Sequence, residues 1–471
     1  MDRRRFVATG AIAAAAPSLA WAQGATAQVS IAEQAQRYLE IMRGPMDDDA
    51  AYAALTPLLA ITFPRQLLPR ARAQLRPLQI HGALRAGETT AEFDAFDPTM
   101  EIWVLLTLHF ESDPRHRITN LQGAPGKRPA DVPAPPRLKG PALGAAIAER
   151  ANRLVPQDQF SGAVLVAQAG RVETQGAWGL ADRERKVANT PQTQFRFGSM
   201  GKMFTAVSVM RLLQDGKLDM KAPLGTYLKD YPNTDIARGV TLDNLLTHTG
   251  GTGDIFGPEF TAHRLELKDP KDYVALYGAR APLFPPGTRQ QYSNYGFMLL
   301  GRIVEAASGQ SYDDYIAAHI FAPAGMTSTG NLPETTDLPR RAVGYTGQPG
   351  HLVNAADTLP YRGTPAGGGY STVGDLGRFA DAFMSHRLLD EAHTRLLTTG
   401  GMTGPDGKFT PYDFGSKSGE GRVFWGHSGG APGMNGALRM FPDNGQVLVV
   451  LANLDPPAAE GMTNFVTDRL G

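Results

Sequence analysis

Residues 197–202 read FGSMGK and contain the pattern Ser-x-x-Lys, with Ser199 three residues before Lys202. The apolar residues after Lys202 keep helical spacing as far as Gly216, a residue type that commonly ends a helix. We therefore expect Ser199 at the start of a helix and Lys202 one turn later on the same face. Burial would lower the lysine pKa below its usual ~10.4 and free the amine to take the serine proton. Alone, the pattern is weak evidence, because chance also produces it.

A second stretch reads Tyr292-Ser293-Asn294 and lies in a loop by composition, ahead of a helix expected over about 295–307. In extended backbone, residues i and i+2 point the same way, so the phenol and the amide would face one cavity. The phenol would relay or accept a proton, and the amide would hold a substrate carbonyl and the lysine. In isolation, a buried core tyrosine beside a helix-capping asparagine explains these residues equally well.

Residues 425–430 read WGHSGG and follow a strand-like segment. The glycines would let a substrate backbone approach closely, and His427 would supply a proton or positive charge. A structural histidine is the alternative. The same run spells the nucleophile elbow Gly-x-Ser-x-Gly at Ser428, but that mechanism needs a later histidine, and all ten histidines lie at or before 427. The chain also lacks the H-E-x-x-H pattern of metallohydrolases.

In chain order, Ser-x-x-Lys, Tyr-x-Asn and His-x-Gly resemble the motifs of the penicillin-recognising serine hydrolases. This superfamily includes class C β-lactamases, DD-peptidases and family VIII esterases. The stretches LLTHTGG at 245–251 and PAGGGYS at 365–371 also resemble sequences of these enzymes. The resemblance covers about 145–470. It implies an acyl-enzyme mechanism on small-molecule or peptide substrates that needs no metal or organic cofactor.

The resemblance also implies a role for each motif residue. Ser199 would be the nucleophile, Lys202 and Tyr292 would share general-base work, and Asn294 would orient substrate and lysine. The backbone N–H groups of Ser199 and Gly430 would form the oxyanion hole. Substrate contacts are expected from Ser428, Gly429 and His248, with a structural hydrogen bond as the alternative for His248.

His427 stands where many β-lactamases carry lysine, which favours an esterase or D-amino-acid peptidase. A true β-lactamase or DD-carboxypeptidase is the closest alternative, and a non-catalytic penicillin- or cell-wall-binding protein is an alternative of another class. The implied fold is α+β and β-lactamase/transpeptidase-like, with an antiparallel sheet flanked by helices and a helical insertion. Hairpins are expected at 162–179 and around Asn444-Gly445, and Ser199 at the junction of sheet and insertion.

Residues 30–122 predict a separate, small α+β domain. We expect helices from Ile31 to Met42 and over 63–75, then strands at 78–84, 89–96, 100–109 and 117–121. This pattern loosely resembles cystatin-like or NTF2-like folds, and the domain would serve oligomerisation or docking. Residues 123–141 contain six prolines and predict a semi-rigid linker before the hydrolase domain at 142–471.

Residues 1–22 predict a cleaved signal peptide, because a basic start, a short apolar run and Ala-Trp-Ala at 20–22 follow in order. The Arg-Arg-x-Phe start at 3–6 resembles a twin-arginine signal, and a plain Sec signal is the alternative. No later stretch reaches ~18 apolar residues, so a periplasmic or secreted protein without stable membrane insertion is expected. The 46 basic and 46 acidic residues argue against a nucleic-acid partner. The absence of cysteine excludes disulfides and thiolate nucleophiles.

Overall fold

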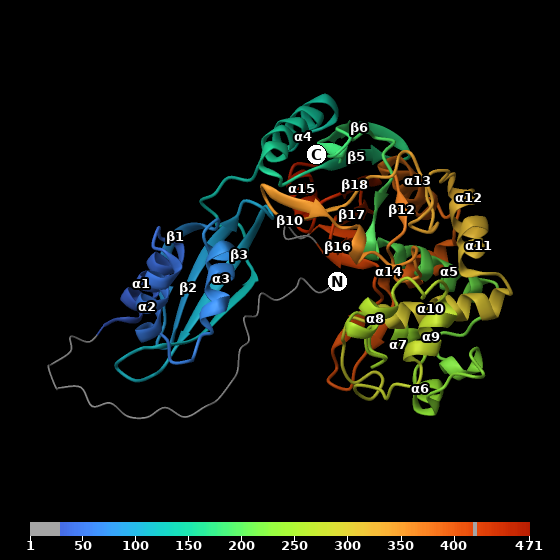
Figure 1. Ribbon diagram of the computed structural model, residues 1–471, viewed down its shortest axis with the longest axis horizontal. Coiled ribbons are helices and arrows are strands. Elements are labelled where there is room, and N and C mark those ends of the chain that lie inside the picture. Colours follow the sequence, from blue (N-terminus) through green and yellow to red (C-terminus); the bar gives the residue numbers. More distant parts are fainter. Residues whose placement is uncertain (1–28, 418–421) are drawn as a thin grey trace. The chain divides into compact units, whose positions relative to one another are not determined.

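The computed structural model of the chain describes residues 29–417 and 422–471 (Figure 1). It divides into two compact units, with the boundary between Pro135 and Pro136 inside the proline-rich segment. The signal-peptide prediction for residues 1–22 lies outside the described residues. Within the described ranges, no helix is long and apolar enough to cross a membrane.

The first unit is an antiparallel four-stranded sheet in sequential order, with helices packed against one face. Its first helix is amphipathic and begins at a capping box, in which Ser30 and Glu33 satisfy each other's backbone N–H groups. The elements are α1 (Ile31–Arg43), α2 (Asp48–Leu55), α3 (Leu68–Leu75), β1 (Gln79–Ala86), β2 (Thr90–Asp97), β3 (Ile102–Phe110) and β4 (Ile118–Pro125). The resemblance to cystatin-like or NTF2-like folds stays a prediction.

Three local expectations for this unit were wrong. Helix α2 was missed, although Asp47 caps it by accepting a hydrogen bond from the backbone of Ala50. The single helix predicted over 63–75 is a 3₁₀ turn at Arg65–Leu67 followed by α3, whose first turn contains a proline. Strand β4 extends to Pro125 because it pairs with Val104 of β3, so the irregular segment begins at 126 and not at 123.

The second unit is built on a six-stranded antiparallel sheet in the order β15-β16-β17-β18-β5-β6. Its early strands pair with its last, since Val164 of β5 lies opposite Val450 of β18. Both predicted hairpins are present. The glycine run at 425–430 lies inside one long strand and not in a loop after it. The strands are β5 (Gly162–Gln168), β6 (Arg171–Trp178), β15 (Gly415–Lys417), β16 (Val423–Ala431), β17 (Met434–Phe441) and β18 (Gln446–Ala452).

Helices cover both faces of this sheet (Figure 1). On β5, Val164 and Val166 pack with α4 (Gly140–Leu154) and α15 (Ala458–Thr467) in one apolar cluster. The alternate residues Ala163 and Leu165 face a second cluster that includes α5 (Lys202–Gln214) and α13 (Val373–Met384). A strand buried on both faces reads as a continuous apolar run, as β5 and β18 do.

The segment between β6 and β15 contains the expected helical insertion, together with short two-stranded ribbons. Its helices are α6 (Thr234–Gly239), α7 (Leu242–Leu246), α8 (Pro258–His263), α9 (Pro270–Tyr277), α10 (Asn294–Ser308), α11 (Tyr312–Ile316), α12 (Ala322–Ala324) and α14 (Glu391–Thr399), besides α5 and α13. Its short strands are β7 (Leu180–Asp182), β8 (Val187–Ala188), β9 (Phe195–Arg196), β10 (Tyr345–Gln348), β11 (His351–Asn354), β12 (Tyr370–Ser371), β13 (Gly401–Thr403) and β14 (Phe409–Pro411). Helix α5 contacts α10 on one side, and the turn before it contacts β16 and β17.

Candidate active site

Ser199 lies on a 3₁₀ turn, Gly198–Gly201, that leads directly into α5. The expected helical start is therefore a tighter turn, with Lys202 as the first α-helical residue. Gly198 has φ +54°, a left-handed conformation that glycine adopts without strain. A side chain there would also meet the backbone nitrogen of Gly430 at 2.8 Å. The turn thus brings the serine against strand β16 because the residue before it is glycine.

Lys202 is completely buried in the first turn of α5. Its Nζ donates hydrogen bonds to Asn294 Oδ1 and to the carbonyl of Ala366, both at 2.7 Å, and lies within hydrogen-bond distance of Ser199 Oγ at 3.3 Å. Burial lowers the pKa of Lys202 from 10.5 to about 7, although the negative charges of Asp413 and Asp254 oppose the change. The amine is therefore neutral in a large fraction of molecules near pH 7 and can accept a proton.

Tyr292 stands on the other side of the serine and is 41% exposed. Its hydroxyl donates to Ser199 Oγ at 2.9 Å, and Lys202 Nζ lies 4.8 Å from the centre of its ring. The ring also stacks on His248, with 4.5 Å between ring centres. Ser199 thus has one proton-transfer partner from α5 and a second from the loop before α10.

Asn294 begins α10 and holds the lysine. Asp254 fixes which way its amide points, because Asp254 Oδ2 accepts from Asn294 Nδ2 at 3.2 Å and Oδ1 accepts from its backbone N–H at 3.1 Å. The amide oxygen is thereby directed to Lys202. The expected contact between Asn294 and the lysine is present, and Asp254 is a supporting residue that the sequence patterns did not identify.

The glycine strand β16 passes directly beneath the serine turn. An ideal Cβ at Gly429 would lie 2.1 Å from the carbonyl oxygen of Phe197 and 2.7 Å from the nitrogen of Ser199, distances that no side chain tolerates. The backbone nitrogens of Ser199 and Gly430 therefore belong to two segments in direct contact. This closeness is what an oxyanion hole made of these two N–H groups requires.

His248 and His427 both hydrogen-bond to the same buried carboxylate. Asp413 Oδ2 lies 2.7 Å from His427 Nε2 and 3.0 Å from His248 Nε2. The side chain of His427 has no exposed surface, and its Nδ1 hydrogen-bonds to the carbonyl of Ser428. His248 is 4% exposed and accepts the backbone N–H of Ser293 on Nδ1. The structural hydrogen bond considered for His248 is present, and His427 is enclosed in the protein instead of facing an open cavity.

Three residues around the site escaped the sequence analysis. Ala366 supplies a carbonyl to Lys202, and its stretch at 365–371 was identified only through the family resemblance. Asp254 and Asp413 lie in irregular segments and carry no motif. A buried acidic residue in a loop leaves no periodic signal, so only its partners in the folded chain distinguish it from a solvated one.

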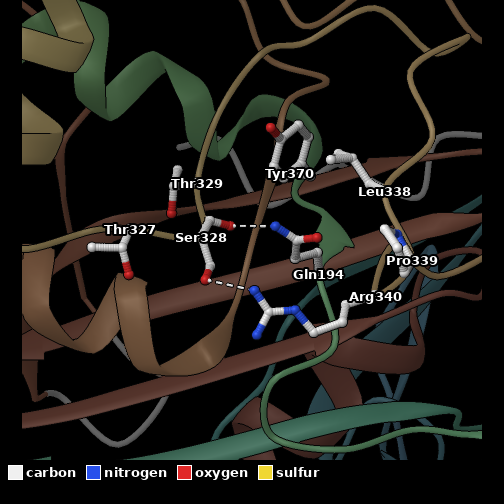
Figure 2. Close-up of a pocket in the computed structure, with 8 residues that line it drawn as sticks. All are labelled: Gln194, Thr327, Ser328, Thr329, Leu338, Pro339, Arg340 and Tyr370. Carbon is white, nitrogen blue, oxygen red and sulfur yellow. Dashed lines mark hydrogen bonds between the residues drawn. The ribbon is translucent and has the colours of Figure 1, made fainter.

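A separate cavity of about 480 Å³ lies away from these residues (Figure 2). Figure 2 shows Gln194 and Arg340 hydrogen-bonded to Ser328, and Tyr370 on a neighbouring wall. Its lining includes none of the predicted site residues. Tyr370 follows Gly369, whose carbonyl accepts a hydrogen bond from the backbone N–H of Phe197, so the stretch at 365–371 connects this cavity to the serine turn.

Residues 146–470 match the family described as Beta-lactamase, which is more than half of the chain. The chain belongs to the Beta-lactamase family. Penicillin-binding protein 4 of Amycolatopsis lactamdurans is 29% identical over 343 residues, which cover 68% of this chain and 86% of that protein. The D-aminopeptidase of Brucella ovis is 26% identical over 317 residues, which cover 66% of this chain and 59% of that protein. The D-stereospecific amidohydrolase from Streptomyces sp. superposes with a TM-score of 0.57 at 25% identity, over 69% of this chain and 98% of that chain.

These similarities confirm the predicted β-lactamase/transpeptidase-like fold and the resemblance to penicillin-recognising enzymes. This family member is a serine hydrolase. The similarity begins after the first unit, at residue 146, and so says nothing about residues 30–122.

Proposed function

We propose that this chain is an exported hydrolase that forms an acyl-enzyme on Ser199 and releases it with water. The observation that carries the proposal is Lys202, a fully buried amine with a pKa of about 7 in contact with the serine hydroxyl. A lysine kept neutral by burial is a functional base, and it would be an unfavourable choice for packing alone.

The contacts support a sequence of steps. Lys202, held by Asn294, takes the proton of Ser199 as the oxygen attacks the substrate carbonyl. The negative charge that forms on the carbonyl oxygen is stabilised by the N–H groups of Ser199 and Gly430. Tyr292 then passes its proton to the departing amine or alcohol as the carbonyl–leaving-group bond breaks, and Lys202 returns the serine proton to Tyr292. Water completes the reaction on the acyl-enzyme with the same groups in reverse.

We infer that the substrate is an ester, or an amide or peptide of a D-amino acid. The similarity to a D-aminopeptidase and a D-stereospecific amidohydrolase supports this choice over a β-lactam. The histidine at 427 also supports this choice, because many β-lactamases carry lysine at that position. Hydrolysis of a β-lactam or a DD-peptide is the competing outcome. Export rests on the signal-like sequence at 1–22, and an N-terminus of the mature protein near Gln23 would support it.

The test has two arms. The purified protein is treated with a fluorophosphonate and, separately, with a penicillin, and the modified residue is located by mass spectrometry. We expect an adduct on Ser199 and none in Ser199→Ala; an adduct on Ser428, or turnover that persists in Ser199→Ala, would refute the mechanism. Turnover of a short nitrophenyl ester, a D-amino-acid amide, a D-Ala-D-Ala peptide and a chromogenic cephalosporin then identifies the substrate class.

A further inference from the structure

Both ring nitrogens of His427 make a hydrogen bond, and the partner of each nitrogen is an acceptor. Nε2 faces the carboxylate of Asp413 at 2.7 Å, and Nδ1 faces the carbonyl oxygen of Ser428. A neutral imidazole has a single N–H, so one of these contacts would set two lone pairs against each other. Both contacts are favourable only if His427 carries two protons. The arrangement therefore requires an imidazolium.

The ring of His248 is different, because only one of its partners is an acceptor. Its Nδ1 accepts the N–H of Ser293, so its proton lies on Nε2 and points to Asp413. His248 is neutral in this arrangement. The carboxylate of Asp413 then accepts one hydrogen bond from each histidine. Its negative charge is balanced by the positive charge of His427, so the buried cluster of Asp413, His427 and His248 has no net charge.

Asp413 has the character that this arrangement needs. Burial by itself raises the pKa of its carboxyl, but the neighbouring His427 and His248 outweigh burial and hold that pKa well below its usual range. Its side chain is 5% exposed and lies in the segment between β14 and β15. Among the described residues, Lys202 of α5 also interacts electrostatically with Asp413, and Tyr292 lies on the face of His248.

We propose that Asp413 is a positioning residue of the hydrolase site, which holds His427 as a buried imidazolium and joins it through His248 to the Tyr292 loop. His427 and Gly429 are two residues apart in β16, so they point to the same face of the strand. A fixed positive charge there favours the negative charge that develops beside the N–H groups of Ser199 and Gly430. His427 is then a source of electrostatic stabilisation and not a proton donor to substrate.

The same carboxylate sets the position of Tyr292. His248 stacks on the Tyr292 ring and binds the backbone of Ser293, while Asp413 holds the far side of the His248 ring. Strand β16 and the loop before α10 are therefore connected through one acidic side chain. Loss of that side chain would release both walls of the site at once, although neither Tyr292 nor Ser199 is altered.

The protonation state is tested by NMR on the full chain with ¹⁵N-labelled histidine, with His427 assigned from the His427→Gln spectrum. We expect two protonated ring nitrogens on His427 in the wild type, because both ring nitrogens face acceptors. In Asp413→Asn, we expect His427 to lose one of these two ring protons, because the carboxylate that holds it is gone. A neutral His427 in the wild type at pH 8, or no change in Asp413→Asn, would overturn the proposal. This readout needs no turnover, so it stands apart from a failure of the proposed function.

The positioning role, which rests on the proposed function, is tested by kinetics on ester hydrolysis with active sites counted by fluorophosphonate. Asp413→Asn should lower kcat by about 10- to 100-fold, the effect of a displaced catalytic group. The matched control Asp443→Asn changes an aspartate that is 60% exposed and should leave kcat unchanged. Because His427→Gln already removes the positive partner of Asp413 and leaves it only His248, the double variant should lose less than the product of the single losses. Losses that multiply would refute the coupling.

Discussion

Replacement of Lys202 by methionine tests whether this lysine is neutral in the folded protein. Below pH 7 the folded chain holds the charge of Lys202 in the interior, and above pH 7 it releases the proton, whereas unfolded lysine keeps its proton up to pH 10.5. The difference between 10.5 and about 7 corresponds to an unfavourable contribution of about 5 kcal/mol, at about 1.4 kcal/mol per pKa unit. Methionine has a similar length and no charge, so it removes this contribution. The unsatisfied oxygens of Asn294 and Ala366 cost about 1–3 kcal/mol each and offset much of the gain, so the pH trend of the difference is the decisive quantity.

The sign follows from proton counting. The folded pKa of Lys202 is depressed, so between pH 7 and 10.5 the unfolded chain binds one more proton than the folded chain. Wild-type stability at this site therefore rises with pH, by about 1.4 kcal/mol per unit, while the methionine variant does not share the rise. The advantage of Lys202→Met over the wild type should shrink by roughly 3 kcal/mol from pH 7 to pH 9.5.

Urea unfolding at several pH values measures the difference in unfolding free energy between Lys202→Met and the wild type. The contribution of the first unit cancels in this difference because both proteins contain it. Lys229→Met, at an exposed lysine, is the control and should show no such trend. A difference between Lys202→Met and wild type that stays constant from pH 7 to pH 9.5 would show that Lys202 keeps its proton in the folded state. The proposed base would then be incorrect.

Three further predictions concern the reaction. Because the neutral amine of Lys202 is needed, kcat/KM for an ester should fall tenfold per pH unit below about pH 7, and a profile flat from pH 5 to pH 9 would contradict this. Tyr292→Phe removes the hydroxyl that donates to Ser199 and should slow acylation by about 10²-fold, measured as the pre-steady-state burst; an unchanged burst would exclude the phenol from proton transfer. Gly429→Ala places a methyl group 2.7 Å from the Ser199 nitrogen, so strand β16 must shift and acylation should fall by about 10²–10³-fold; wild-type rates would show that this contact is not needed for the oxyanion site.

Several features of the fold could be predicted because their signals are local. The hairpin at Asn444-Gly445 depends on a turn that accepts a left-handed residue, and Gly445 has φ +71°. Helix α1 begins at Ser30 with its capping box, and α5 keeps its apolar periodicity. The 3₁₀ turn at Gly198–Gly201 could not be predicted, because it results from close contact with β16, more than 200 residues later in the chain.

The sequence by itself determined which chemical groups are present. Ser199, Lys202, Tyr292, Asn294 and the glycines of β16 were found from short motifs, since the spacing within each motif is set by one turn of helix or one step of strand. Only the tertiary structure decided how those groups behave. The pKa of Lys202 depends on burial, and the charge of His427 depends on Asp413 and on the carbonyl of Ser428. Burial and hydrogen-bond partners arise from segments that are distant in the chain, and no local pattern records them.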